Sequence, residues 1–163
     1  MTRQLDQLDR RIIALLQDNG RATSSEIADR LGVSARTVRS RINRMVECRA
    51  VLPTFVVNHR FFGYQTAVDI FCEIDIRQME EIGRRLGQLP EVNYIAFSTG
   101  DQDVSIQALL ESNDDLYEFV QTLIRIPGIR RTRTVLVPRI LKNTYEWLPP
   151  DSAFEEWSGD QQD

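Results

Sequence analysis

Apolar residues recur at three- and four-residue steps in the first third of the chain, and this spacing is typical of amphipathic helices. The first stretch is predicted to form a helix that Asp6 or Asp9 caps and that stops at Asn19 and Gly20. Its apolar face comprises Leu5, Leu8, Ile12, Leu15 and Leu16.

Two shorter helices are predicted to follow. Thr23 and Glu26 have the spacing of a capping box, in which each side chain accepts a hydrogen bond from the other residue's backbone. Gly32 ends this helix, because glycine tolerates the left-handed backbone of a tight turn. Ser34 then caps a third helix that runs to about Cys48. Three short helices with a tight turn between the last two predict a helix-turn-helix over residues 1–52.

The third helix separates apolar from basic positions at about 100° per residue. Its apolar side carries Val38, Ile42 and Met45, and its opposite side carries Arg36, Arg39, Ser40, Asn43 and Arg44. In a helix-turn-helix this helix enters the DNA major groove, where arginine pairs with guanine and asparagine with adenine. A solvated face is the alternative, but no acid occurs from Arg30 to Val46, whereas solvated faces usually mix both signs. The predicted DNA-binding residues are Ser34, Arg36, Thr37, Arg39, Ser40, Arg41, Asn43 and Arg44.

A connector follows over residues 53–65. Pro53 excludes a helix interior, and the β-branched residues after it predict a short extended piece that serves as a wing and then a hinge. His59 is the only histidine of the chain, and no potential metal ligands surround it in the sequence, so it is interpreted as a loop residue.

From Thr66 the apolar period changes to two, which is typical of strands. Strands are predicted at 66–76, 92–99, 104–111 and 129–141, with helices at 78–89 and 113–126. This order, βαββαβ, predicts a ferredoxin-like domain over residues 66–145 and an α+β protein overall.

The two faces of the predicted sheet differ in character. One face is expected to be buried and carries Val68, Ile70, Cys72, Ile74 and Ile76. The other is expected to carry Asp69, Phe71, Tyr94, Ala96, Ser98, Gln107, Leu109 and Leu136. Such a mixture is typical of a subunit interface, although an antiparallel sheet can also be partly exposed. A homodimer is therefore predicted, since DNA readers with two-fold symmetry need a dimerising part.

Charge supports a division into two parts with different partners. Residues 1–60 carry a formal charge of +5, and the rest carries −9. The basic part favours a polyanion such as double-stranded DNA. Residues 146–163 form an acidic tail, of which DSAFEEWSGDQQD is expected to be mobile, and whether Trp147 and Trp157 pack on a neighbouring subunit stays open.

Several classes of protein do not fit the sequence. No apolar run approaches the roughly 20 residues that span a membrane, and the polar N-terminus resembles neither a signal nor a transit peptide. Cys48 and Cys72 are interpreted as reduced, buried thiols of a cytoplasmic protein. No catalytic set, cofactor-binding loop or metal-ligand spacing is present, so neither an enzyme nor a cofactor is expected. A protein-interaction module whose helix-turn-helix no longer binds DNA is the remaining alternative.

The stretches LDQLDRRIIALLQDNGRATSSEIADRLGVSARTVRSRINRM, VVNHRFFG and GDQDVSIQ give the chain a family resemblance. From about Leu5 to Leu141 the sequence resembles the Lrp/AsnC (feast/famine) family of transcriptional regulators. The resemblance implies dimers that often assemble into octamers and a small-molecule effector, usually an amino acid, which binds between dimers. It departs at Arg49, where the family usually has a glycine that closes the third helix.

The resemblance places the effector near the turn that here reads STGDQD. The implied effector-binding residues are Ser98, Thr99, Gly100, Asp101, Gln102 and Asp103. Backbone N–H groups at Gly100 could hold a carboxylate, and Asp101 or Asp103 could accept an α-ammonium. Glycine and aspartate also dominate ordinary turns, so a hairpin without a ligand is the alternative.

Overall fold

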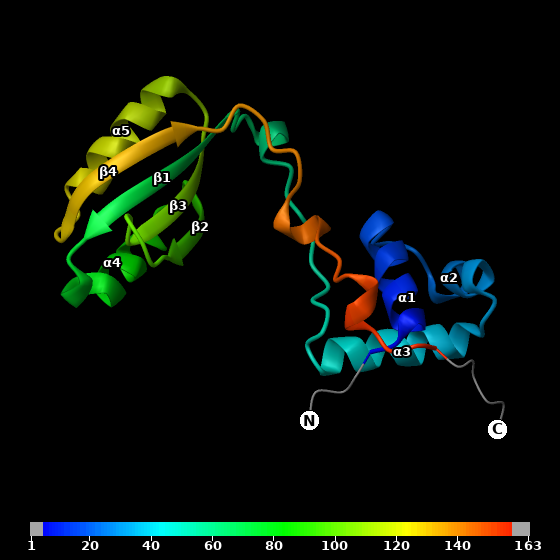
Figure 1. Ribbon diagram of the computed structural model, residues 1–163. Helices are drawn as coiled ribbons and strands as arrows, with labels where there is room; N and C mark the ends of the chain where they lie inside the picture. The colour runs from blue at the N-terminus through cyan, green and yellow to red at the C-terminus, as the bar shows by residue number, and fades with distance from the viewer. Residues whose placement is uncertain (1–4, 158–163) are drawn as a thin grey trace. The chain divides into compact units, whose positions relative to one another are not determined.

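The computed structural model describes residues 5–157 (Figure 1). Within them, residues 5–55 and 142–157 form one compact unit, and residues 56–141 form a second. The chain therefore leaves the first unit, builds the whole of the second, and returns to the first.

The first unit contains the three predicted helices, α1 (Gln7–Asp18), α2 (Ser24–Leu31) and α3 (Ala35–Glu47). Thr23 and Ser34 cap α2 and α3 as predicted, and Asp6, one of the two predicted candidates, caps α1, while Gly32 ends α2 with a φ of 68°. The helices enclose a core of Leu8, Ile12, Ile27, Ala28, Val38 and Met45. The predicted helix-turn-helix is confirmed.

The end of α3 has an arginine where the family resemblance leads us to expect a glycine. Arg49 has a φ of 58°, the left-handed backbone that glycine adopts at little cost. Its N–H donates to the carbonyl of Val46, and the N–H of Ala50 donates to that of Met45. The helix therefore closes by the glycine geometry, with an arginine in its place.

The expected wing is wrong, and the described part of the tail that was expected to be mobile packs against the first unit. No strand is assigned within residues 53–65, where His59–Phe62 forms a short 3₁₀ helix instead. Residues 151–157 are not a detached tail, because they bond to the start of α1 and Trp157 packs against the helix-turn-helix core. Residues 158–163 of the predicted tail lie outside the described residues.

The second unit has the predicted ferredoxin-like fold. Its sheet order is β2-β3-β1-β4, and all three pairs are antiparallel. Its elements are β1 (Thr66–Ile74), α4 (Met79–Leu86), β2 (Val92–Phe97), β3 (Val104–Leu110), α5 (Asn113–Ile124) and β4 (Ile129–Leu136).

Both helices cover one face of the sheet, because Ile82 and Leu86 of α4 and Phe119 and Leu123 of α5 share one buried cluster with the strands. The strand residues of this cluster are Val68, Ile70, Cys72, Ile74, Val104, Ile106, Ala108 and Leu110. The opposite face of the sheet, which we call the open face, carries no helix of the second unit, residues 56–141 (Figure 1).

Two residues differ from their predicted faces. Ile76 lies beyond β1 and is exposed. Leu136 pairs with buried Val68 and so lies on the helix-covered side, while Val135 takes the open face. A bulge in β4 causes this change, because one extra residue reverses the alternation of all residues after it.

The two cysteines have different environments. Both are free, and Cys72 is buried, as expected, whereas Cys48 is exposed and so is not a core thiol. Burial raises the pKa of the Cys72 thiol to about 11, because the charged thiolate is poorly solvated there.

Candidate nucleic-acid interface

Helix α3 begins with a firm side-chain cap. The Ser34 Oγ accepts a hydrogen bond from the Thr37 N–H at 3.0 Å and lies 2.8 Å from the Thr37 hydroxyl. This cap satisfies one of the free N–H groups at the start of the helix. Ser34 is exposed, whereas Thr37 is half-buried.

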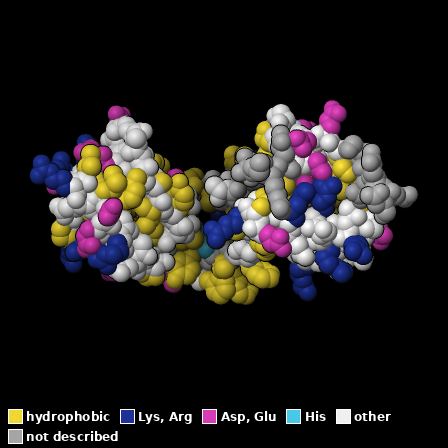
Figure 2. All heavy atoms as spheres, turned by 90° about the horizontal axis from the view of Figure 1, so that it is seen from below, with side chains coloured by type: hydrophobic (Ala, Val, Ile, Leu, Met, Phe, Trp, Pro, Cys, Tyr) yellow, Lys and Arg dark blue, Asp and Glu magenta, His cyan; other side chains and the backbone are white. Residues whose placement is uncertain are grey.

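One side of α3 is exposed and basic. Arg36, Arg39, Ser40 and Asn43 are all exposed and recur at steps that place them on one side of a helix. Glu47, in the last turn, is the single acid of α3. Figure 2 shows several Lys and Arg side chains at the surface of the helix-turn-helix unit. We call Ser34, Arg36, Arg39, Ser40 and Asn43 together the basic face.

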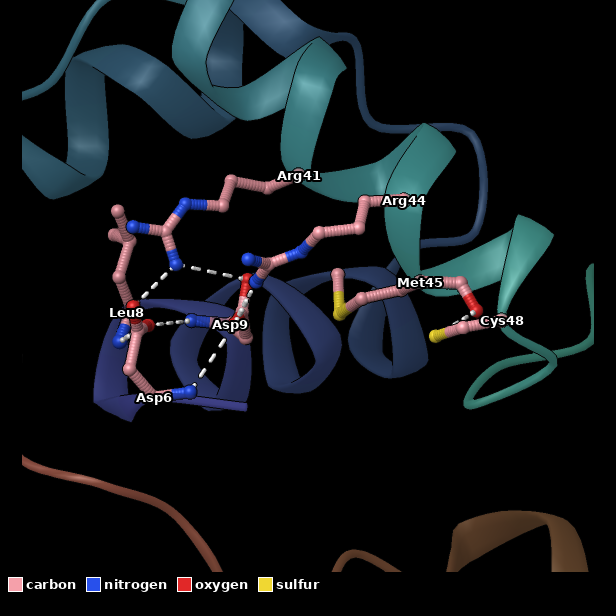
Figure 3. A network of polar contacts seen from close by, with 7 residues as sticks. All are labelled: Asp6, Leu8, Asp9, Arg41, Arg44, Met45 and Cys48. Carbon is pink, nitrogen blue, oxygen red and sulfur yellow. Dashed lines mark hydrogen bonds and ion pairs between the residues drawn. The ribbon is translucent and has the colours of Figure 1, made fainter. Parts of the chain in front are cut away.

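Arg41 and Arg44 do not share the basic face. Both reach back to α1, where Arg41 pairs with the carboxylate of Asp6 and lies 3.2 Å from Oδ1 of Asp9. The Arg44 Nη2 lies 2.5 Å from Oδ2 of Asp9 (Figure 3). Both guanidinium groups are therefore engaged within the domain, which distinguishes them from the exposed residues of α3, and their predicted contact with DNA stays a prediction.

The carboxylate of Asp9 is fully buried, which makes this network costly to break. A buried charge without its partner destabilises a protein strongly, because water no longer solvates it. Burial, the largest single effect, raises the pKa of the Asp6 carboxyl, but the hydrogen bonds from Arg41 and from the backbone N–H groups of Asp9 and Leu8, together with the charge of Arg41, outweigh it, so the net pKa is lowered. We infer that these two arginines fix the position of α3 on α1.

The sequence carried a signal for this network. Asp9 lies four residues after Leu5 and three before Ile12, which places a carboxylate within the apolar stripe of α1. A buried acid requires a basic partner, but the pattern alone does not say that the partners are Arg41 and Arg44 of α3.

The predicted effector residues form the hairpin between β2 and β3. The Ser98 N–H donates to the carbonyl of Asp103 at 2.9 Å, and the Ser98 hydroxyl donates to that of Gln102 at 3.2 Å. Gly100 has a φ of 139°, which favours glycine. The residues Ser98, Thr99, Gly100 and Asp101 are exposed, and Gln102 and Asp103 are half-buried.

The two acids of this turn differ in their contacts. The Asp103 Oδ2 accepts a hydrogen bond from the Ile74 N–H at 2.8 Å, and its own N–H donates to the Cys72 carbonyl at 3.0 Å. Asp103 therefore ties the hairpin to β1. The Asp101 carboxylate has no hydrogen bond or ion pair within residues 5–157, so it remains open to a cationic group.

A cavity of about 400 Å³ lies elsewhere in the second unit. No residue of the 98–103 turn lines it. The lining residues are Tyr64, Leu89, Pro90, Glu91, Leu110, Glu111, Asp115, Glu118, Phe119 and Thr122.

Two other kinds of feature are absent from the described part of the chain. None of its helices has the length and apolarity to span a bilayer. Residues 5–157 contain no group of three or more His, Cys, Asp or Glu side chains arranged to hold a metal ion.

Two family models match the chain, one for each unit. The AsnC-type helix-turn-helix domain matches residues 5–46, and the Lrp/AsnC ligand binding domain matches residues 68–147. The first match contains α1, α2 and α3, and the second contains the complete βαββαβ order.

Relatives and solved structures agree with these matches. An HTH-type transcriptional regulator of Pyrococcus furiosus is 33% identical over 86% of this chain and 97% of its own length. One of Pyrococcus abyssi is 32% identical over 87% and 91%. The structure of Escherichia coli AsnC has a TM-score of 0.79 at 25% identity, over 86% of this chain and 98% of that one. A Neisseria meningitidis transcriptional regulator, solved as a complex with L-Met, has a TM-score of 0.81 at 23% identity, over 88% and 96%.

Proposed function

Because this chain belongs to the Lrp/AsnC family of transcriptional regulators, we propose that it binds duplex DNA through the basic face of α3 and is regulated by a small-molecule ligand. The observation that carries the proposal is that Arg36, Arg39, Ser40 and Asn43 are exposed together on a capped helix. A regulator acts where the DNA is, so we also propose a cytoplasmic location.

The members of the basic face have different proposed roles. Arg39 and Asn43 lie in the body of α3, where side chains reach base edges in the major groove. Ser34 and Arg36 lie at the start of the helix, where hydroxyl, guanidinium and backbone N–H groups suit a phosphate. Ser40 adds a polar contact between them, and Thr37 supports the cap. Arg41 and Arg44 contribute indirectly, by holding α3 against α1.

For the effector we propose an amino acid bound at the 98–103 turn. Asp101 supplies a carboxylate for the α-ammonium, and the backbone N–H groups around Gly100 supply donors for the carboxylate. The L-Met in the Neisseria structure supports an amino-acid ligand as a class.

We also propose that the open face forms a homodimer, which can assemble further into an octamer. The face combines aromatic and charged side chains, since Phe71 stacks under Arg133 at 4.9 Å and Glu73 lies 3.6 Å from Arg131. Tyr94 on the same face is half exposed. Aromatic residues and arginine are enriched in protein interfaces.

Binding to DNA as a function of salt tests the proposal. A duplex of about 30 base pairs is first selected by the protein from a random pool, and its affinity is then measured at several salt concentrations. Each phosphate contact should contribute about −0.9 to the slope of log affinity against log salt. Failure to select any sequence, or an affinity that does not change with salt, would instead favour the protein-contact module.

A further inference from the structure

The segment 148–157, which we call the return segment, lies beyond the match to the ligand binding domain, which ends at residue 147. The P. furiosus relative aligns over 97% of its own length but only 86% of this chain. The return segment nevertheless packs on the DNA-binding unit. Neither of the two matched family domains therefore explains why this segment packs on the DNA-binding unit.

The return segment forms a two-residue parallel bridge with the start of α1. The Glu155 N–H donates to the carbonyl of Leu5 at 2.8 Å, and the Gln7 N–H donates to the carbonyl of Glu155 at 2.9 Å. Gln7 is the first residue of α1, so its N–H has no partner within the helix. The bridge thus provides a hydrogen-bond acceptor for a backbone N–H at the N-terminus of α1.

Side chains reinforce this attachment. The Arg10 Nε lies 2.8 Å from Oδ1 of Asp151, and the Gln7 side-chain amide donates to the Asp151 carbonyl at 3.0 Å. Trp157 packs against the helix-turn-helix core. Its indole N–H is buried and has no hydrogen-bond acceptor within residues 5–157, so packing alone accounts for its place.

Asp6 connects the return segment to α3. It lies between Leu5 and Gln7, the two residues that the segment bonds, and its carboxylate pairs with Arg41 of α3. The N-terminus of α1 is therefore held on one side by the return segment and on the other by α3.

We propose that the return segment positions α3 for reading DNA, and that Trp157 is its principal positioning residue. This inference rests on the proposed function. A helix that is displaced on its support keeps many long, flexible phosphate contacts but loses base contacts that depend on geometry. The return segment should therefore affect specific binding more than non-specific binding.

The test compares two tryptophans of the same C-terminal stretch. Trp157→Ala removes the packed side chain, and Trp147→Ala removes a side chain that is 62% exposed. Trp157→Phe keeps a ring and loses only an N–H that makes no hydrogen bond. Two DNA probes are used, a duplex selected from a random pool by the unaltered protein and a mixed-sequence duplex of the same length.

We expect Trp157→Ala to lose about tenfold in affinity for the selected duplex, comparable to one poorly read base pair, and about twofold or less for the mixed duplex. Trp147→Ala and Trp157→Phe should match the unaltered protein on both. A second pair avoids any loss of core packing. Glu155→Pro removes the N–H that donates to Leu5, so it should reduce the ratio of the affinity for the selected duplex to that for the mixed duplex. Glu155→Ala keeps this N–H and should leave that ratio unchanged.

Other outcomes overturn the inference. An equal loss on both duplexes means only that less protein is folded, because a reduced competent fraction lowers every affinity alike. A gain in affinity for Trp157→Ala would show that the acidic segment competes with DNA. If the unaltered protein prefers the selected duplex and the Trp157→Ala and Glu155→Pro variants keep the same preference, this inference fails and the proposed function stands. An unaltered protein that does not discriminate defeats the proposed function and this inference with it.

Discussion

Asp6 and Asp9 each combine a local task with a distant one. Asp6 caps α1 and Asp9 completes the capping box, while both also bind guanidinium groups of α3. A cap is visible in the sequence because its partners lie within three residues. The ion pairs with α3 are not visible, because they depend on how two helices cross.

The lowered pKa of Asp6 makes the first unit sensitive to acid. A carboxyl whose pKa is lower in the folded than in the unfolded chain stabilises the fold above the unfolded value, near 3.8, and that contribution is lost as pH falls through the folded pKa. We expect Asp6→Asn to be less stable than the unaltered protein at neutral pH, and the difference to shrink as pH falls from about 5 toward 2.

Urea unfolding at a series of pH values, followed by the circular dichroism of the helices, measures this difference. Asp18→Asn, at the exposed end of α1, is the matched control and should show no such convergence. A difference that stays constant with pH would contradict the role assigned to the Asp6 carboxylate.

Arg49 offers a stabilising substitution. Its left-handed backbone costs an L-residue with a side chain about 1 kcal/mol that glycine avoids. Arg49→Gly should therefore raise the free energy of unfolding by about 1 kcal/mol. Arg49→Ala removes the same charge but keeps Cβ and should show no such gain, so equal stabilities of the two variants in urea would contradict the strain argument.

At the scale of the element, α3 has three sides rather than two. One side is apolar and contacts the core, one is basic and exposed, and between them Arg41 and Arg44 turn toward α1. A helical wheel cannot separate the exposed arginines from Arg41 and Arg44. It records only the direction of each side chain around the axis, and it contains no information on Asp6 and Asp9 of the neighbouring helix α1.

Arg39 and Arg44 should behave as opposites. Arg39→Ala should lower the affinity for a selected duplex by about 1–3 kcal/mol and leave the melting temperature unchanged, since Arg39 is exposed. Arg44→Ala should lower the stability of the first unit by about 3 kcal/mol, because it takes a partner from the buried Asp9 carboxylate.

Calorimetric melting and fluorescence anisotropy on the same preparations separate the two effects. Equal melting temperatures for Arg44→Ala and the unaltered protein would refute the positioning role of the buried network. Unchanged DNA affinity for Arg39→Ala would remove Arg39 from the basic face.

The hairpin between β2 and β3 allows a similar comparison of two acids. Asp101→Asn should abolish the thermal shift produced by an effector amino acid, because it removes the unpaired carboxylate, and should leave the ligand-free melting temperature unchanged. Asp103→Asn should instead lower the ligand-free melting temperature, because Asp103 bonds the Ile74 N–H.

A thermal-shift screen with the twenty amino acids identifies the ligand for this comparison, and a ligand at 100 times its Kd should stabilise by about 2.7 kcal/mol. If Asp101→Asn keeps the full shift, the ammonium does not bind there. If no amino acid shifts the unaltered protein, the effector proposal fails.

At the scale of the whole molecule, the chain order and the spatial order differ. The first unit combines both ends of the described chain, and the second is built entirely from the middle. The open face of the second unit and the basic face of the first are therefore separate surfaces on separately folded bodies. A substitution on the open face should therefore leave both units folded.

The oligomer should depend on the open face. Tyr94→Glu and Phe71→Glu add a charge to the open face, which already carries Asp69 and the Glu73–Arg131 pair, and burying it at a subunit contact would be unfavourable. We expect both variants to sediment as smaller species than the unaltered protein. Tyr117→Glu, on the exposed side of α5, is the control, and equal sedimentation of all four proteins would place the subunit contact elsewhere.

The sequence by itself determined the elements and their order. Caps at Asp6, Thr23 and Ser34, the Gly32 turn and the alternation in β1 are confirmed, because each depends on residues a few positions apart. The same local logic predicted the helix-turn-helix and the ferredoxin-like domain, and it gave the basic face most of its residues.

Only the tertiary structure decided where Arg41 and Arg44 point, which face Leu136 takes and what the return segment does. The arginines turn inward because Asp6 and the buried Asp9 of α1 bind them, and Leu136 changes face because of one extra residue in β4. Trp157 is half-buried against the core that α1, α2 and α3 form in the first third of the chain. Contacts between distant parts of a chain leave no periodic trace in its sequence, so their outcome is set only when the chain packs.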